Sequence, residues 1–281
     1  MQIFILRSFS FFTVLVLPLM LIYLLMDDNY HLDGGDIIFR YQKEKILNTK
    51  NDVKVAYFGD SSCGNAISAK ILGPNYMNLS LVGDFNIKGV YEMIKMTKKY
   101  HPDLDSIIII NTLDVFPRKN KKRFQFDLKG QYSFDEKLKR SFSIFFRRLK
   151  VLKIHNIFKQ KRHIKNDFLN QDNRILVAPM QFNLDRNISI DNMNSIKKIV
   201  NFCDKNGIEY LFMIGPNVKI KENLNYKSIT EFFKKNDYNF SSSYYQLNDK
   251  NIGNTNDHVW YDYKEDATYF YNNERRDFFK R

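Results

Sequence analysis

The stretch VAYFGDSSCGNA, residues 55–66, decides how the chain folds. It begins as a short apolar run and breaks into Gly-Asp-Ser, followed by a second Ser, a Cys and another Gly. We predict a strand at residues 53–58 and a helix-like segment from the Gly-Asp-Ser turn to Leu72. Ser61 at this turn is either a helix cap or a nucleophile, and the tripeptide alone leaves both readings open.

The same alternation of strands and helices continues along the chain. The run SIIIINTL, residues 106–113, has four consecutive isoleucines, which indicates a strand buried on both faces, as in a parallel sheet covered by helices. The pattern predicts a three-layer α/β/α fold with a mainly parallel sheet. The other expected elements are strands at residues 76–79 and 208–215 and helices at about residues 85–100, 191–206, 228–235 and at the carboxyl terminus.

The amino terminus predicts a membrane anchor. Residues 8–26 carry no charged side chain, and this run matches the roughly 20 residues that a helix needs to cross a bilayer. Arg7 precedes the run and Asp27 and Asp28 follow it, so the positive-inside rule places the rest of the chain outside the cytoplasm. A cleaved signal peptide is the alternative, but no Ala-x-Ala-like site follows the run. We therefore predict a signal anchor at residues 1–29, in the cell (inner) membrane.

The remainder divides into a spacer and a domain. Residues 30–52 read as a polar juxtamembrane spacer with a short helix, and residues 53–281 as the extracytoplasmic α/β domain. Within the domain, residues 117–174 are basic and aromatic with apolar residues at helical spacing, which indicates an insertion. Its amphipathic helix lies either on a membrane surface or against the domain.

Composition narrows the partners. The chain has 44 Lys and Arg against 31 Asp and Glu, and its net charge of +13 favours anionic partners. Because the domain is predicted to lie outside the cytoplasm, we expect a surface polysaccharide or another anionic envelope polymer and no nucleic acid. Cys63 and Cys203 suggest neither a disulfide framework nor metal-ligand spacing, and we predict two unpaired, half-buried thiols.

Polar residues follow the predicted strands, where α/β sheets collect their ligands. Gly59-Asp60-Ser61 follows the first strand, Asn111 to Asp114 follows the third, and Asp257-His258 precedes the last helix. A serine, a later Asp and a His are the parts of acyl-transfer chemistry, because a hydroxyl nucleophile needs a base and the base needs an orienting carboxylate.

These blocks resemble the SGNH (GDSL-type) hydrolase superfamily. More narrowly, the anchor and the segments FGDSSCGNAI, NLSLVGDFNIKG and NTNDHVW are similar to membrane-anchored SGNH-like proteins of cell-surface polysaccharide and teichoic-acid modification. The resemblance spans about residues 53–115 and 175–275 and omits the insertion. It implies a flavodoxin-like SGNH hydrolase fold preceded by one transmembrane helix.

The resemblance assigns roles to the residues after the strands. Ser61 is the nucleophile by this pattern, and its own N–H and that of Gly83 stabilise the oxyanion. The family's third donor is an Asn side chain in a Gly-x-Asn-Asp arrangement, but Leu113 stands at that position here. Asn111 is the candidate replacement, and one lost oxyanion donor costs about 10²–10³ in rate.

The terminal motif departs from the family as well. The family's Asp-x-x-His spacing, counted from Asp257, falls on Trp260. Alternatively, His258 is the base in a shifted register, with Asp257 or Asn254 beside it. Asp60 and Trp260 are candidate substrate-binding residues, and Trp260 either stacks on a sugar ring or packs in the core.

Two functions follow from these residues. In the first, the chain is an extracytoplasmic serine O-acyltransferase or esterase in which Ser61 carries the acyl group, His258 moves the proton and Asp257 orients His258. This chemistry requires no metal and no diffusible cofactor, and the resemblance implies that a membrane partner protein delivers the acyl donor. In the second, an inactive SGNH-like fold is a binding or assembly protein of an envelope polysaccharide machine. A His nitrogen within hydrogen-bond reach of Ser61 favours the enzyme, whereas an indole there favours the binding protein.

Overall fold

The part of the chain described by the computed structural model is a body of sheet and helices. It comprises residues 34–119, 187–218, 224–248, 250–253 and 257–280, with a few isolated positions among the first 21 residues. Nearly all of them belong to one of two compact units of the chain, residues 38–124 and 164–281. Most of the predicted anchor and residues 120–174 of the predicted insertion lie outside the described residues. Within the described part, no helix combines the length and apolar character that a membrane span requires.

The described strands form one parallel sheet of five strands. The strand order is β2-β1-β3-β4-β5, which is the order of flavodoxin-like doubly wound sheets. The predicted α/β class with a parallel sheet is confirmed, although β5 was not predicted. In chain order the strands are β1 (Val55–Gly59), β2 (Tyr76–Asn78), β3 (Ser106–Asn111), β4 (Glu209–Ile214) and β5 (Phe240–Ser241).

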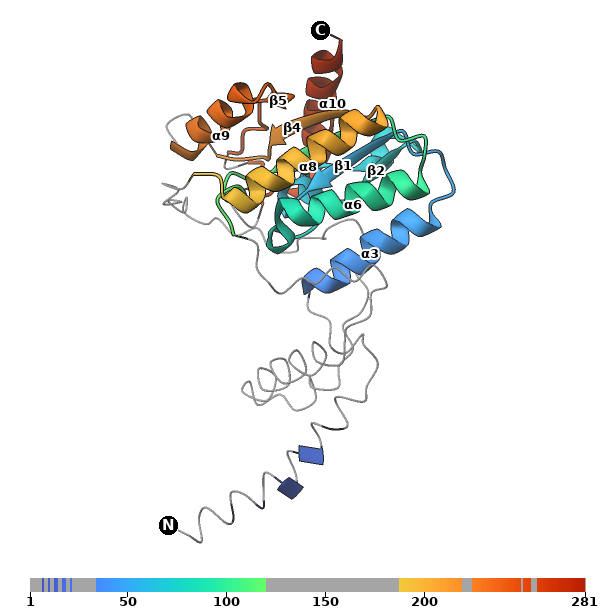
Figure 1. Ribbon diagram of the computed structural model, residues 1–281, viewed down its shortest axis with the longest axis vertical. Coiled ribbons are helices and arrows are strands. Elements are labelled where there is room, and N and C mark those ends of the chain that lie inside the picture. Colours follow the sequence, from blue (N-terminus) through green and yellow to red (C-terminus); the bar gives the residue numbers. More distant parts are fainter. Residues whose placement is uncertain are drawn as a thin grey trace. The chain divides into compact units, whose positions relative to one another are not determined.

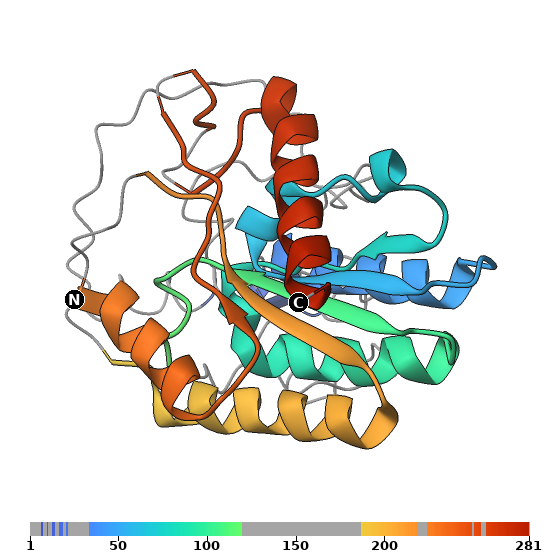
Figure 2. The ribbon, with the colours of Figure 1, turned by 90° about the horizontal axis from the view of Figure 1, so that it is seen from above.

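Helices cover both faces of the sheet (Figure 1). Figure 2 shows α6 (Asn86–Tyr100) and α8 (Ile190–Asn206) side by side on one face and α10 (Lys264–Phe279) on the other. The short helices α4 (Ser61–Ala66) and α5 (Ala69–Leu72) contact α10. Helix α9 (Leu224–Lys235) packs beside β4 and β5, with the Phe233 ring 5.0 Å from that of Phe212.

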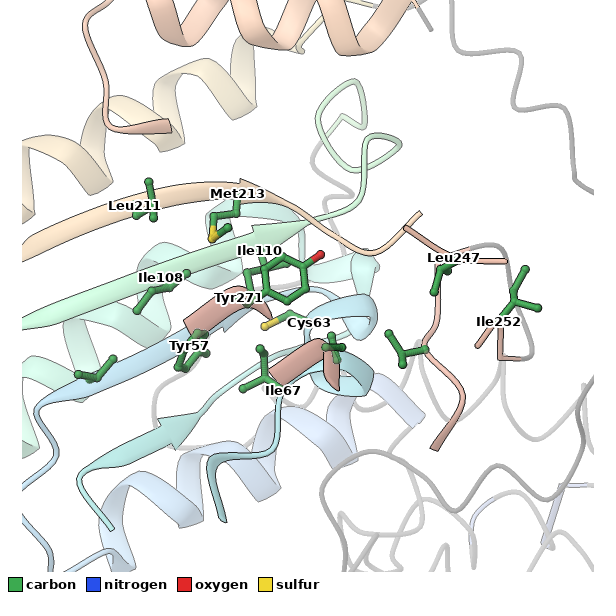
Figure 3. Close-up of a cluster of buried hydrophobic side chains, with 14 residues drawn as sticks. Tyr57, Cys63, Ile67, Ile108, Ile110, Leu211, Met213, Leu247, Ile252 and Tyr271 are labelled. Atoms are coloured by element: carbon green, nitrogen blue, oxygen red, sulfur yellow. The ribbon is translucent and has the colours of Figure 1, made fainter. Parts of the chain in front are cut away.

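Strand β3 lies at the centre of the core. Its four isoleucines, Ile107–Ile110, are fully buried, which confirms the expectation of a strand buried on both faces. Ile108 and Ile110 join a cluster on the α10 side, and strand alternation turns the other two toward the opposite face. Figure 3 shows this cluster, which includes Tyr57, Cys63, Ile67, Leu211, Met213 and Tyr271.

Helix α3 (Gly34–Asn48) lies where a short helix was expected in the predicted spacer, and it packs on the domain. The ring of Phe39 stacks on that of Phe85 with centroids 5.5 Å apart, and Ile46 is fully buried. The buried Gln42 donates from Nε2 to the carbonyl oxygen of Ser80 at 2.8 Å. Positions 39, 42 and 46 recur at helical spacing, so one face of α3 packs beside the end of β2.

Both cysteines are free thiols, and both are fully buried and not half-buried as predicted. Cys63 lies in α4 beneath α10, and Cys203 lies on the inward face of α8. Burial raises the pKa of each thiol to about 12. Neither thiol is therefore a nucleophile at neutral pH.

Candidate active site

A glycine shapes the turn that carries Ser61. Gly59, the last residue of β1, has a φ of 150°, and a Cβ built on it would lie 1.8 Å from the carbonyl oxygen of Ile110. Only glycine therefore allows β1 and β3 to approach at this point. The turn that follows places Ser61 at the carboxyl edge of the sheet as the first residue of α4.

Asp60, and not Ser61, caps helix α4. Its carboxylate accepts hydrogen bonds from the backbone N–H of Ser62 at 2.9 Å and from the Ser62 hydroxyl. It also accepts from the N–H and the hydroxyl of Thr112 at 2.8 and 2.7 Å. The bonds to Thr112 join the turn after β1 to the loop after β3. Because Asp60 caps the helix, the alternative in which Ser61 is the cap is wrong.

The Asp60 carboxyl is buried within this network. Its pKa is raised above the ordinary value, chiefly by burial and secondly by the charge of Asp257, while the hydrogen bonds from Ser62 and Thr112 act in the opposite direction. The side chain is almost inaccessible and bonded to internal donors. Its predicted contact with substrate stays a prediction, whereas its contacts here position the Ser61 turn.

His258 meets Ser61 from the far end of the chain. Its Nε2 lies 3.0 Å from the Ser61 hydroxyl oxygen. The segment before α10 is held by an antiparallel bridge between Ile252 and Val259 and by a hydrogen bond from the Gly253 N–H to the His258 carbonyl at 2.7 Å. These contacts hold the backbone on both sides of the imidazole, and the 3.0 Å approach of Nε2 to the hydroxyl is the geometry required of a general base.

Asp257 lies near the same imidazole nitrogen. Its Oδ1 is 3.8 Å from Nε2 of His258, the nitrogen that faces Ser61. In a Ser-His-Asp triad the carboxylate binds the other ring nitrogen, so this geometry differs from the usual orienting contact. The predicted orienting role of Asp257 stays a prediction.

Trp260 does not take the place of the base. Its indole Nε1 donates to the carboxylate of Asp262 at 3.1 Å, and the side chain is partly exposed and not in the core. The residue that faces Ser61 is therefore the imidazole in the shifted register, and not the indole. Stacking of Trp260 on a sugar stays a prediction.

The three predicted oxyanion donors lie at or after the ends of three different strands. Ser61 follows β1, Gly83 begins the 3₁₀ helix η3 (Gly83–Phe85) after β2, and Asn111 is the last residue of β3. Leu113, at the family's Asn position, is fully buried. The Asn111 side chain is also buried, and its Nδ2 has no hydrogen-bond partner among the described residues. Asn111 thus holds an unsatisfied donor at the carboxyl end of β3.

Charged side chains lie in the loop after β3, close to these residues, and the motif pattern assigned no individual role to Thr112, Asp114 or Arg118. The Thr112 hydroxyl, bonded to Asp60, also contacts the carboxylate of Asp114, and Asp114 pairs with Arg118. The Arg118 guanidinium lies against Gly83, where a Cβ would be 2.8 Å from Nη1. The Asp114–Arg118 spacing of four residues is the signal that the sequence offered. No group of three or more potential metal ligands occurs among the described residues.

Comparison with solved structures finds a distant likeness. No protein-family model matches the chain, and no curated protein matches it. Among solved structures, the chain is similar to a crystal structure from Bacteroides fragilis whose printed description is "putative acylhydrolase". The identity is 12%, the TM-score is 0.43, and the match covers 89% of this chain and 98% of the other. A likeness this distant assigns no activity to the chain.

Proposed function

We propose that the chain is an SGNH-type serine esterase or O-acyltransferase that works through an acyl-Ser61 intermediate. The observation that supports this proposal most directly is the 3.0 Å approach of His258 Nε2 to the Ser61 hydroxyl. Its second support is that the Trp260 indole, the rival for this place, is bonded to Asp262. A serine activated by an adjacent base is the arrangement that acyl transfer requires.

The proposed reaction has two steps. The Ser61 oxygen attacks the acyl carbonyl of an ester while its proton moves to Nε2 of His258. The tetrahedral intermediate then expels the alcohol, which takes that proton, and leaves the acyl group on Ser61. In the second step, water or an acceptor hydroxyl attacks the acyl carbonyl and gives its proton to His258. The tetrahedral intermediate then expels the Ser61 oxygen, which takes that proton back from His258, and the acyl group leaves as an acid or a new ester.

The oxyanion of each tetrahedral intermediate needs hydrogen-bond donors. In this proposal the backbone N–H groups of Ser61 and Gly83 supply two of them. The buried Nδ2 of Asn111 supplies the third, since it has no partner among the described residues and an unsatisfied buried donor is costly to keep.

The substrate class follows from charge and predicted location. The net charge of +13 favours an anionic polymer, and the predicted anchor places the domain outside the cytoplasm. We therefore propose O-acyl groups of a surface polysaccharide as the target, with a membrane partner as acyl donor if the reaction is a transfer.

A catalytically inactive binding protein is the second candidate. It is favoured by the buried Leu113 at the family's Asn position and by Asp257, which stands 3.8 Å from the imidazole nitrogen that faces Ser61. In that case the same surface would hold a polysaccharide without cleaving an ester.

Fluorophosphonate labelling of the full-length protein, read by intact mass, separates the two candidates. The enzyme should gain one label, Ser61→Ala should gain none, and His258→Ala should react far more slowly. Ser242→Ala, at an exposed serine, is the matched control and should label like the wild type. A folded wild-type protein that takes no label would reject the enzyme in favour of the binding protein.

A further inference from the structure

We propose that Arg118 determines substrate specificity by binding an anionic group, a carboxylate or a phosphate, beside the ester held at Ser61. This inference rests on the proposed function for the position of the ester. It adds a residue that neither the motif pattern nor the resemblance assigns.

The guanidinium occupies the space that a side chain at position 83 would fill. A Cβ on Gly83 would lie 2.8 Å from Nη1 and 3.6 Å from Cζ of Arg118. Gly83 supplies a proposed oxyanion donor, so the guanidinium lies beside the edge where the acyl carbonyl would bind. A substrate held at this donor would therefore present its neighbouring groups to Arg118.

The main chain at Arg118 is held in place by three side chains. Its carbonyl oxygen accepts from Nδ2 of Asn86 at 3.0 Å, from Nδ2 of Asn192 at 3.1 Å and from the hydroxyl of Ser189 at 2.9 Å. Asn86 belongs to α6, whereas Ser189 and Asn192 lie at the start of α8. Convergence of these donors fixes the backbone from which a partly exposed side chain, 41% accessible, extends. A fixed anchor with an accessible head is suited to ligand recognition.

Asp114 orients the head without covering it. Nη2 of Arg118 pairs with Oδ2 of Asp114, while Nη1 lies against Gly83. The other oxygen of Asp114 contacts the Thr112 hydroxyl, so the carboxylate is itself held in place. A guanidinium oriented in this way can present further N–H donors to a carboxylate or a phosphate.

Carboxylates surround the candidate site, and Arg118 provides a positive charge among them. Asp114 belongs to the loop after β3, and Asp257 lies near the imidazole of His258. Carboxylates so close to the site repel an anionic polymer, although the chain as a whole carries +13. Arg118 offsets this repulsion where the ester binds, so a site suited to an anionic substrate depends on it.

A binding experiment without turnover tests this role. Titration calorimetry on the full-length Ser61→Ala protein compares 4-acetoxybenzoate with its methyl ester, in which a methyl group replaces the negative charge of the carboxylate. We expect the charged ester to bind more tightly, and Arg118→Gln in this background to lower the ratio of the two affinities by about 10- to 100-fold. Arg118→Lys should recover part of the ratio.

Arg276→Gln is the matched control, because this arginine is exposed on α10, and it should leave the ratio unchanged. 4-Acetoxyphenyl phosphate, titrated in parallel, shows whether the site favours a phosphate over a carboxylate. The inference would be overturned if Arg118→Gln left the affinity ratio unchanged. It would also be overturned if Arg118→Gln and Arg276→Gln lowered the ratio equally. The proposed function fails separately, through absent fluorophosphonate labelling, since these titrations require no catalysis.

Discussion

Nε2 of His258 lies 3.0 Å from the hydroxyl oxygen of Ser61, although 197 positions separate the two residues in the sequence. The turn after β1 holds the serine, and the bridge between Ile252 and Val259 holds the segment that carries the histidine. Both segments lie at the carboxyl end of the parallel sheet, where the loops of α/β proteins assemble their sites. The fold therefore delivers a nucleophile and a base to one place from opposite ends of the domain.

Replacing the base should slow the reaction without unfolding the protein. His258→Gln keeps a polar side chain but cannot take the Ser61 proton, so kcat/KM for p-nitrophenyl acetate should fall by about 10²–10⁴. His101→Gln is the control. That histidine is buried at the end of α6 with its Nε2 3.0 Å from the carbonyl of Ile46, so its loss should lower stability and spare the kcat/KM of the folded fraction. Equal kcat/KM for His258→Gln and the wild type would contradict the proposed role.

Two glycine substitutions test the approach of β1 to β3. Gly59→Ala places a Cβ within 1.8 Å of the Ile110 carbonyl oxygen, and we expect a loss above about 4 kcal/mol in the free energy of unfolding, or no folded protein. Gly73→Ala is the comparison. Gly73 also has a positive φ, of 115°, but a Cβ built on it has no neighbouring atom within 4 Å. It should cost only about 1–3 kcal/mol from backbone strain. Urea unfolding measures both, and equal losses would show that strain and not the clash dominates at Gly59.

Strong local patterns made most of the fold predictable. The four isoleucines of β3 indicated a strand buried on both faces, and the helix expected at residues 191–206 is present as α8. Strand β5 escaped prediction because it has two residues and is supported by the stacking of Phe240 on Phe233, with ring centroids 4.6 Å apart. That contact depends on tertiary packing, and a two-residue segment is too short to show a strand pattern in the sequence.

The candidate site was also predictable only in part from the sequence. Ser61 and His258 stand in recognisable motifs, whereas the bonds from Thr112 to Asp60 span 52 positions and depend on the register of β1 against β3. Arg118 gained its candidate role only when the structure placed its guanidinium against Gly83. Residues that act through long-range contacts need the fold before their function can be read.

The two thiols should be unreactive in the folded protein. Both Cys63 and Cys203 are buried, and burial raises the pKa of each to about 12. Iodoacetamide at pH 8 should therefore add no mass to the native protein and two carbamidomethyl groups after denaturation in guanidinium chloride. Alkylation of either thiol at a native-state rate close to that of free cysteine would contradict the observed burial.

The Asp60 carboxyl should make stability depend on pH. Burial raises its pKa in the folded state, so the neutral form is favoured by folding. The Thr112 hydroxyl has one hydrogen yet contacts the carboxylates of both Asp60 and Asp114, and a proton on one carboxyl completes both bonds. The stabilisation from Asp60 is therefore fully present below its unfolded pKa of about 3.8 and is lost as pH rises through the folded value.

Asp60→Asn removes this titration and also loses acceptor oxygens for Ser62 and Thr112. We expect it to lower the free energy of unfolding by about 1–3 kcal/mol at low pH, with a smaller difference from the wild type as pH rises. Asp52→Asn, at an exposed carboxylate, is the control and should stay within about 0.5 kcal/mol of the wild type at pH 7. Urea unfolding across pH 4–8 measures the difference. A gap between Asp60→Asn and the wild type that widens toward high pH would show that the folded state favours the ionised carboxylate, contrary to the direction argued here.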